Sequence, residues 1–582
     1  MDLDFALVAI GGVVLIVAAA AFSRRLGVAA PLLLVLVGIG YSFIPGVPSI
    51  EIEPELILMG VLPPLLYAAA IQLPVVDFRR NFSSISALSV LLVLVTAFGT
   101  GFLLYAIFPE LSFAAAVAIG AVISPTDAVA ATALGKKLGL PPRLVLILEG
   151  ESLVNDATAL VLLRSAVAAA AATAELSPWE IAGDFVFAVS LALVIGLAIG
   201  WVTVWIRTKI HDPMIDSVLS LAVPFIAYIP AEHFHASGVL AVVAAGLYSG
   251  HQSAKHFSAQ SRISEKLNWR TVQFVLENGV FLLMGAQILT LVDDVRTDGA
   301  TVHAIMLGLL MTGVLVVVRF LFIVPLLLDL RRRHDLAVRQ QSRFAAGIQR
   351  LRAMTDASLR SERRADRAQK LLDRRKVDLQ QLRSEGLGWR GGVVLGWSGM
   401  RGVVTLAAAQ SLPLEVPYRS QLVLLAFVVA VTTLLVQGGT LPLLIRLTGI
   451  RGTDRVADRR ELATLLEELG TAGLEALEKP EFELSTGAEI DPAVIERVRS
   501  DTLLGAESAW ERAENGTDDR GIAQSPHQQY RALRREVLQA ERAALLDARA
   551  SGTYPSRILS RAQAMLDLEE TRLEQIDNPS GS

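Results

Sequence analysis

The chain has 582 residues, of which 53% are hydrophobic and only 19% are charged. This balance excludes an ordinary soluble globular protein and indicates a membrane protein with many apolar helices. Cysteine is absent, which excludes disulfides and thiolate metal sites, whereas the formal net charge of −4 is unremarkable.

The first apolar run begins after two acidic residues, Asp2 and Asp4, where a secretory signal would carry positive charge. No small-residue cleavage pattern follows, so we expect this run to be kept as a helix. A helix needs about 20 apolar residues to cross the hydrocarbon core, and runs near that length predict thirteen spans. The predicted spans are 4–22, 28–46, 55–73, 84–108, 111–135, 142–172, 179–206, 214–230, 236–250, 269–293, 302–330, 392–411 and 419–448.

Basic residues test this count, because Lys and Arg concentrate in cytoplasmic loops. They occupy every second predicted loop, and the loops between hold almost none, with Arg296 and Arg419 as the exceptions. The basic loop residues include Arg24, Arg25, Arg79, Arg80, Lys136, Lys137, Arg207, Lys209, Lys255 and Arg262. With an odd number of spans, this alternation predicts a multi-pass protein of the plasma membrane with its N-terminus outside and its C-terminus in the cytoplasm.

Two polar segments divide the chain into four parts: 1–330 with spans 1–11, a basic insertion at 331–390, 391–450 with spans 12–13, and a tail at 451–582. Leucines at helical spacing predict amphipathic cytoplasmic helices in the insertion. We favour the interpretation that the insertion is a solvated helical hairpin whose basic residues only reflect the excess of Lys and Arg in cytoplasmic loops. The alternative is that these residues contact anionic lipid headgroups. The helical tail contains no nucleotide-binding glycine loop, metal cluster or catalytic triad, and we expect it to regulate the protein or contact a second copy.

Span 5 contains the stretch GAVISPTDAVAA. Pro125 removes a backbone donor and clashes with the preceding turn, which leaves carbonyls around Ile123 able to help coordinate a cation. Thr126 and Asp127 follow directly. A broken helix at membrane depth is tolerated only where protein or a water-filled cavity satisfies it, so these residues predict an ion site.

Span 6 contains the polar stretch EGESLVND, with apolar residues on both sides of it. At 100° per residue, Ser152 and Asp156 share one helix face, and Glu151 and Asn155 share the neighbouring one. Carboxylate, hydroxyl and carbonyl oxygens suit hard cations, and the lack of His and Cys disfavours a transition metal. Glu149 is most simply a carboxylate that the helix dipole favours near the start of the helix.

Buried arginines accompany these acids. Arg401 lies among glycines in GWSGMRGVV of span 12, where the glycines either permit close packing or interrupt the helix. If spans 1–6 and 8–13 are inverted repeats, spans 5 and 12 correspond, and two interrupted helices in such positions indicate a transport site at the midplane. Arg319 of span 11 also requires a partner. We expect Glu151 to form a structural ion pair with Arg319, with Arg401 as the alternative.

Other intramembrane acids differ in their expected roles. Asp156 and Asp127 lack an obvious local partner and are expected to be functional, because an intramembrane charge is costly unless it serves a purpose. Glu277 could be structural or functional. We therefore predict that these two aspartates are functional, whereas the paired glutamate is structural.

The motifs together resemble those of the monovalent cation:proton antiporters of the Na+/H+ exchanger type. ESLVND is similar to the family's E-S-L-x-N-D element, SPTDAVA to T/S-D-P-V-A, GMRGVV to G-L/M-R-G, and LPPLLYAAA to L-P-P-L-L-F. The resemblance covers about residues 1–450. We predict an all-α polytopic membrane protein with thirteen transmembrane helices as two inverted six-helix repeats with discontinuous crossing helices, plus the cytoplasmic insertion and tail. The resemblance also implies a homodimer.

The resemblance implies a role for each matching residue. Asp156 would bind the cation or the proton, Asp127, Ser152 and the Thr126 backbone would complete the alkali-cation site, and Asn155 would support it. These five residues form the predicted cation and proton site.

Two departures from the family's pattern bear on selectivity. Ala68 follows Tyr67 where the family often has an acid, and Ala128 follows Asp127 where many members have proline. One potential ligand is therefore absent, which affects cation selectivity and affinity rather than the class of reaction.

The predicted activity is exchange of Na+, or of K+ or Li+, for H+ by alternating access, in pH and cation homeostasis. Asp156 can hold a proton or a cation but not both, which couples the two flows. Asn155 in place of a second carboxylate suggests electroneutral 1:1 exchange. Transported ions and membrane lipid are the expected partners, with no cofactor, enzyme activity or nucleic acid. The alternatives are a proton-uncoupled cation channel or a transporter-derived membrane sensor.

Overall fold

The chain folds into helices wherever the computed structural model describes it. The described residues are 3–45, 53–171, 178–210, 212–296, 300–353, 388–450, 452, 455–478, 492–496, 498–500, 510, 533–534, 536–545, 565–566, 568–570 and 573. The all-α prediction is confirmed for these residues, which contain no strand. The chain divides into two compact units, Met1–Thr453 and Asp454–Ser582, and the second begins with α21 (Arg455–Glu478).

The first half of the membrane unit runs from α1 to α9. Its elements are α1 (Leu3–Leu26), α2 (Ala30–Ser42), η1 (Leu56–Val61), α3 (Leu62–Gln72), α4 (Val75–Arg80), α5 (Phe82–Ser86), η2 (Ala87–Leu91), α6 (Leu92–Ile107), α7 (Phe113–Ile123), α8 (Val129–Leu138) and α9 (Pro142–Ala171). The η elements are π-helical turns that continue into the next α-helix. Ser112 is the N-cap residue of α7, and its hydroxyl accepts a hydrogen bond from the backbone N–H of Ala115 at 3.2 Å.

The second half runs from α10 to α20. Its elements are α10 (Pro178–Arg207), α11 (Pro213–His233), α12 (Gly238–His256), α13 (Ala259–Ala286), α14 (Ile288–Arg296), α15 (Thr301–Ala353), α17 (Trp389–Trp397), α18 (Val403–Gln410), α19 (Arg419–Thr433), η3 (Leu434–Gly438) and α20 (Gly439–Thr448). Helix α15 continues past the predicted end of span 11 at residue 330. The start of the basic insertion is therefore helical, and 354–387 lies outside the described residues.

Seven of the described helices are long and apolar enough to cross a membrane. They are Phe82–Ile107, Pro142–Ala171, Gly183–Arg207, Pro213–His233, Gln260–Val295, Thr301–Arg332 and Arg419–Thr448. Other predicted spans coincide with shorter helices, such as α2 with its 13 residues, or with helices that are interrupted. Large apolar side chains such as Phe102, Trp201 and Leu321 are exposed on the outside of the unit, as expected for surfaces that face lipid.

Two predicted spans are interrupted. Helix α7 ends at Ile123 and α8 begins at Val129, so the backbone is not helical at the proline break of span 5. Likewise α17 ends at Trp397 and α18 begins at Val403, at the glycine-rich stretch of span 12. Each interruption leaves backbone groups without helical partners, and these groups must be satisfied by the surrounding protein.

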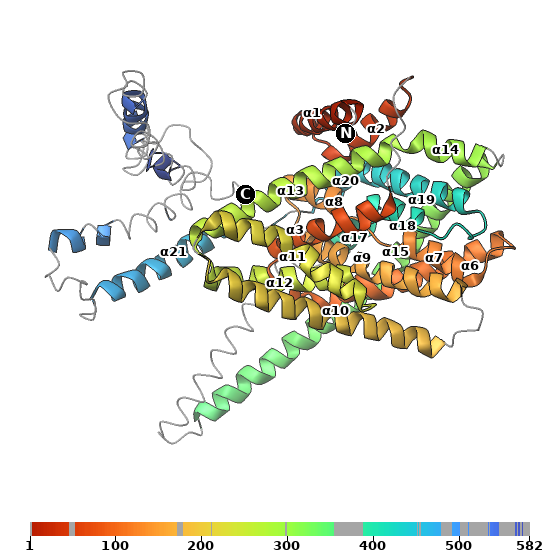
Figure 1. The fold of residues 1–582 in the computed structure, drawn as a ribbon. Coiled ribbons are helices and arrows are strands. Elements are labelled where there is room, and N and C mark those ends of the chain that lie inside the picture. Colours follow the sequence, from red (N-terminus) through yellow and green to blue (C-terminus); the bar gives the residue numbers. More distant parts are fainter. Residues whose placement is uncertain are drawn as a thin grey trace. The chain divides into compact units, whose positions relative to one another are not determined.

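Figure 1 shows the helices of the membrane unit, and their mutual contacts divide them into two groups. We call α6 to α9, α15 and α17 to α20 the site bundle, because both interrupted helices lie in it. We call α1 to α3 and α10 to α13 the flanking bundle. Helices within each group contact one another more extensively than they contact the other group, with α9 and α18 among those at the boundary.

Candidate functional site

The two interrupted segments meet and bond through their backbones. The N–H of Asp127 donates to the carbonyl of Met400 at 2.6 Å. In return, Nε of Arg401 donates to the carbonyl of Ile123 at 3.1 Å, and the same guanidinium donates to the carbonyl of Gly399. The carbonyl that we expected to be available for a cation at Ile123 therefore accepts from an arginine. Each break therefore provides a hydrogen-bond partner for a backbone group that the other break leaves without a helical partner.

A polar stretch within α9 forms hydrogen bonds with the break between α7 and α8. Asn155 donates through Nδ2 to the carbonyl of Thr126 at 2.9 Å and to its Oγ1 at 3.1 Å. Thr126 donates through Oγ1 to Oε1 of Glu151 at 2.8 Å. The N–H of Ala128 donates to Oγ of Ser152 at 3.4 Å. The structure thus brings Thr126, Glu151, Ser152 and Asn155 together.

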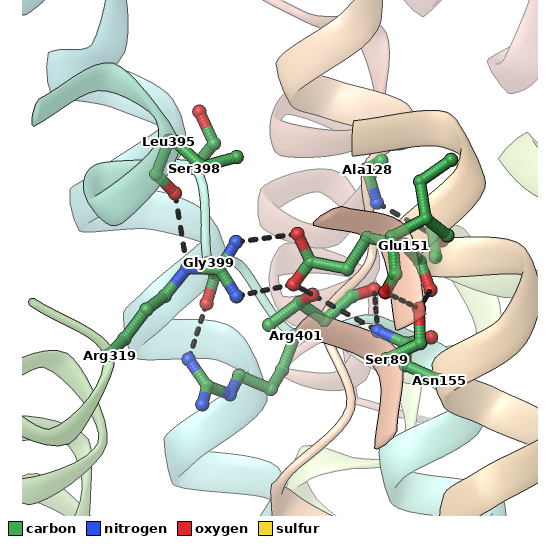
Figure 2. Close-up of polar contacts among 12 residues, drawn as sticks. Ser89, Ala128, Glu151, Asn155, Arg319, Leu395, Ser398, Gly399 and Arg401 are labelled. Atoms are coloured by element: carbon green, nitrogen blue, oxygen red, sulfur yellow. Dashed lines mark hydrogen bonds and ion pairs between the residues drawn. The ribbon is translucent and has the colours of Figure 1, made fainter. Parts of the chain in front are cut away.

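Glu151 and Arg319 form a bidentate ion pair (Figure 2). The two nitrogen–oxygen distances are 2.5 and 2.9 Å, and the exposed fractions of the residues are 1% and 2%. Nε of Arg319 donates to the carbonyl of Leu395 at 3.1 Å, so one arginine joins α9, α15 and α17. Our first choice of partner is present. The alternative, Arg401, forms no ion pair within the described residues, because Arg319 already engages both carboxylate oxygens.

Asp156 lies near the first break. Within the described part of the chain, its carboxylate makes no hydrogen bond and no ion pair, and it is only partly buried. It borders a cavity of about 10 Å³, roughly the least space that holds one water. Residues of α7, the first break and α18 complete the lining, among them Pro125, Val404 and Ala408. A carboxylate in this position can take up a proton or a small cation.

Asp127 is nearby but partly engaged. Its Oδ1 accepts from the N–H of Val129, the first residue of α8, at 2.8 Å. Two like charges in one site attract a cation more strongly than one. The Oδ1 of Asn155 is buried without a partner in the described residues. Because a buried acceptor without a donor is costly, this oxygen is suited to a bound cation or water.

A model of one transporter family matches most of the chain. It is described as "Sodium/hydrogen exchanger, transmembrane" and matches residues 12–447. The chain belongs to the sodium/hydrogen exchanger family. Two relatives in this family are similar over much of their length. An uncharacterized Na+/H+ exchanger of Mycobacterium tuberculosis is 29% identical, over 96% of this chain and 94% of its own. The Na+/H+ antiporter ApNhaP of Aphanothece halophytica is 29% identical, over 75% of this chain and 72% of its own.

A solved structure has a similar fold. The sodium proton antiporter MjNhaP1 from Methanocaldococcus jannaschii superposes with a TM-score of 0.53 at 15% sequence identity. The match covers 77% of this chain and 100% of that chain. At this identity the likeness concerns the fold alone. It supports the prediction of an antiporter-like helical fold for this member of the exchanger family.

Two other acidic residues singled out in the sequence of this exchanger-family chain have partners of their own. Glu149 pairs with Lys136 of α8 at 2.8 Å and is half-exposed. Glu277 accepts from Nε2 of Gln273 at 2.6 Å, within α13 of the flanking bundle. Sequence reasoning missed Ser89, whose hydroxyl donates to the carbonyl of Glu151 at 3.2 Å. It also missed Thr433, whose Oγ1 accepts from the N–H of Arg401 at 3.0 Å.

Glycine at position 402 keeps space for Asp127. A methyl group there would lie 2.8 Å from Cβ and 2.9 Å from Cγ of Asp127, whose backbone is held by Met400. We expect Gly402→Ala to displace the carboxylate and to lower alkali-cation-driven proton movement by about tenfold or more, because a misplacement near 1 Å can cost on the order of 100-fold. The measurement is the rate of pH-gradient dissipation in proteoliposomes.

The matched control for this substitution is Gly313→Ala on α15, where an added methyl meets nothing within 4 Å. It should leave the rate unchanged. Equal activity of the two variants would contradict a role for Gly402 in placing Asp127.

Proposed function

We propose that this chain is a secondary active antiporter that exchanges Na+, or another alkali cation such as K+ or Li+, for H+ by alternating access, in pH and cation homeostasis. The observation that carries the proposal is the contrast between two acids on α9. Glu151 is neutralised by Arg319, whereas Asp156 has no partner in the described residues and borders the break. A carboxylate that is not paired can exchange its ion, and a paired one cannot readily do so.

The proposed cation site contains oxygens from both sides of the break. Asp156 is the proposed carrier of cation or proton, and Asp127, Ser152, Thr126 and Asn155 are the proposed supporting groups. Their carboxylate, hydroxyl, carbonyl and amide oxygens suit a hard cation. The hydrogen bonds from Asn155 to Thr126 and from Ala128 to Ser152 support this assignment, because they hold the residues of the first break against the helix that carries Asp156.

We also propose the finer topology: thirteen spans in two inverted repeats, an outside N-terminus and a homodimer in the plasma membrane. Support comes from interruptions at corresponding positions of the two halves, spans 5 and 12. The symmetry extends to the side chains that hold them. Asn155 of span 6 bonds the first break and Thr433 of span 13 bonds the second. The alternation of basic loops supports the orientation.

The stoichiometry follows from the uncharged side chain at position 155. With Asn155 beside Asp156, one carrier carboxylate exchanges one proton for one monovalent cation, and the cycle moves no net charge. We expect cation-driven proton movement in proteoliposomes to be insensitive to an imposed membrane potential. An electrogenic cycle would respond, since one charge crossing 100 mV is worth about 2.3 kcal/mol.

The same preparation tests the activity as a whole. A pH gradient should dissipate when Na+, K+ or Li+ is added, with the cation of choice identified by titration. Cation movement that follows its own gradient without moving protons would instead indicate a channel. No cation-dependent movement of either ion would favour a membrane sensor.

A further inference from the structure

Polar side chains join the two bundles at one end of the membrane unit. Nε2 of Gln410, the last residue of α18, donates to Oε1 of Gln287 at 3.1 Å. Gln287 lies at the junction of α13 and α14 and is 4% exposed. Residues of α18 also line the cavity beside Asp156, namely Val404 and Ala408. This hydrogen bond therefore ties an interrupted helix of the site bundle to the flanking bundle.

A second bond joins the bundles through the helix that carries Asp156. NH2 of Arg164 on α9 pairs with Oε2 of Glu232 at 2.5 Å. The other oxygen of Glu232 accepts from the N–H of Gly238 at 2.9 Å, which fixes the carboxylate on the flanking bundle. A Cβ at position 238 would lie 2.7 Å from this oxygen, so a larger residue there would require the Glu232 side chain to shift. Arg164 lies eight residues after Asp156, about 12 Å farther along the helix.

Both bonds lie toward the same side in the proposed topology. Helices α9, α11, α13 and α18 belong to spans 6, 8, 10 and 12, which all run from the cytoplasm outward. Arg164, Glu232, Gln287 and Gln410 lie toward the C-terminal ends of these helices. The proposed orientation therefore places both bonds on the outer side of Asp156.

A wide polar cavity lies beside the glutamine pair at that end. Its volume is about 550 Å³, enough for more than about ten waters at ~30 Å³ each. Its polar lining includes Glu55, Gln287, Thr290, Asp294, Gln410 and Arg419. The small cavity at Asp156, of about 10 Å³, is lined by the same helix α18. Helix α18 thus lines both cavities, the wide one through Gln410 and the small one through Val404 and Ala408.

We propose that the Gln410–Gln287 and Arg164–Glu232 bonds are latches that keep Asp156 closed to the outside, and that the wide cavity is the outer entrance for hydrated alkali cations. The inference rests on the proposed function. Alternating access requires the site bundle to move against the flanking bundle, and both bonds must break when the site opens outward. The four residues are positioning residues, which set how often the outer route is open.

The absence of cysteine from the chain allows a direct test. Ala408→Cys places a single thiol in the cavity beside Asp156. The rate of its labelling by a membrane-impermeant thiol reagent, added from outside, reports how often the outer route opens. We expect Gln410→Ala or Arg164→Gln to raise this rate by about two- to tenfold, the range expected from loss of one such bond. Glu232→Gln should act like Arg164→Gln and add little to it, while keeping an acceptor for Gly238.

Two bonds of the same chemistry provide matched controls. Gln72 donates to Gln273 at 3.2 Å within the flanking bundle, and Lys136 pairs with Glu149 at 2.8 Å within the site bundle. Neither bond joins the bundles, so Gln72→Ala and Lys136→Gln should leave labelling at the parental rate. Equal acceleration by these controls would indicate general loosening and would overturn the proposal. An unchanged rate in both latch variants would overturn it as well.

The test separates this inference from the proposed function. Labelling is measured in the Ala408→Cys chain with Asp156 and again with Asp156→Asn, and it requires no transport. If Asp156→Asn still exchanges ions, the proposed carrier is wrong. The proposal of the latches is tested by the labelling rates alone.

Discussion

Asp156→Asn is expected to abolish cation-driven proton movement while leaving an assembled protein. Asparagine has nearly the same shape as aspartate but neither binds a proton at working pH nor carries a charge to hold a cation. Because Asp156 makes no hydrogen bond or ion pair in the described residues, its replacement leaves no charge unpaired. The stability of the variant should therefore match that of the parent.

The measurement is pH-gradient dissipation in proteoliposomes with each alkali cation, together with thermal unfolding in detergent. The control is Asp184→Asn, an exposed aspartate on α10 of the flanking bundle. It should retain exchange at the parental rate. Near-parental exchange in Asp156→Asn would show that another group carries the ions.

Rules that depend on neighbouring residues in the chain indicated which residues belong to the candidate site more readily than they indicated the hydrogen-bond partners of those residues. The costs of a buried charge and of a proline in a helix pointed to Asp127, Asp156 and the first break. Helical spacing predicted the stripes that carry Glu151 and Asn155. These inferences depend only on residues close in the chain, and the described contacts agree with them.

Partners distant in the chain were harder to predict. The carbonyls of Ile123 and Leu395 accept from arginines 278 and 76 residues away. Periodic patterns in a sequence do not predict pairs so far apart in the chain. The guanidinium of Arg401 satisfies backbone groups that its own break and the other break expose, instead of pairing with Glu151. A sequence shows that a buried arginine needs acceptors, but only the fold shows whether they are carboxylates or carbonyls.

The number of spans raises a related difficulty. Hydropathy predicts thirteen apolar runs, whereas seven described helices have the length and composition of a complete span. The difference arises where the chain is interrupted or short. Helices α17 and α18, with 9 and 8 residues, each fall short of the roughly 20 residues that cross a bilayer. They can form a span only together, and the backbone groups at the break between them need hydrogen-bond partners from the other interrupted segment.

Arg319→Gln is expected to be the most destabilising substitution near the site. It would leave Glu151 buried without its counter-ion, and removal of one partner from a buried ion pair costs about 3–5 kcal/mol. The loss extends further, because Nε of Arg319 also holds the carbonyl of Leu395 next to the second break. We expect a lower midpoint in thermal unfolding and little exchange, because Glu151 also accepts from Thr126 at the first break.

The double variant Glu151→Gln with Arg319→Gln separates charge from packing. It removes both charges, so it should recover a large part of the stability lost in Arg319→Gln. Lys136→Gln is the control for an exposed pair, where a loss of about 0–1 kcal/mol is expected. If Arg319→Gln unfolds at the parental temperature, the pair is not what stabilises the break. If the double variant is stable but inactive, the ion pair positions Thr126 for cation binding in addition to holding the fold.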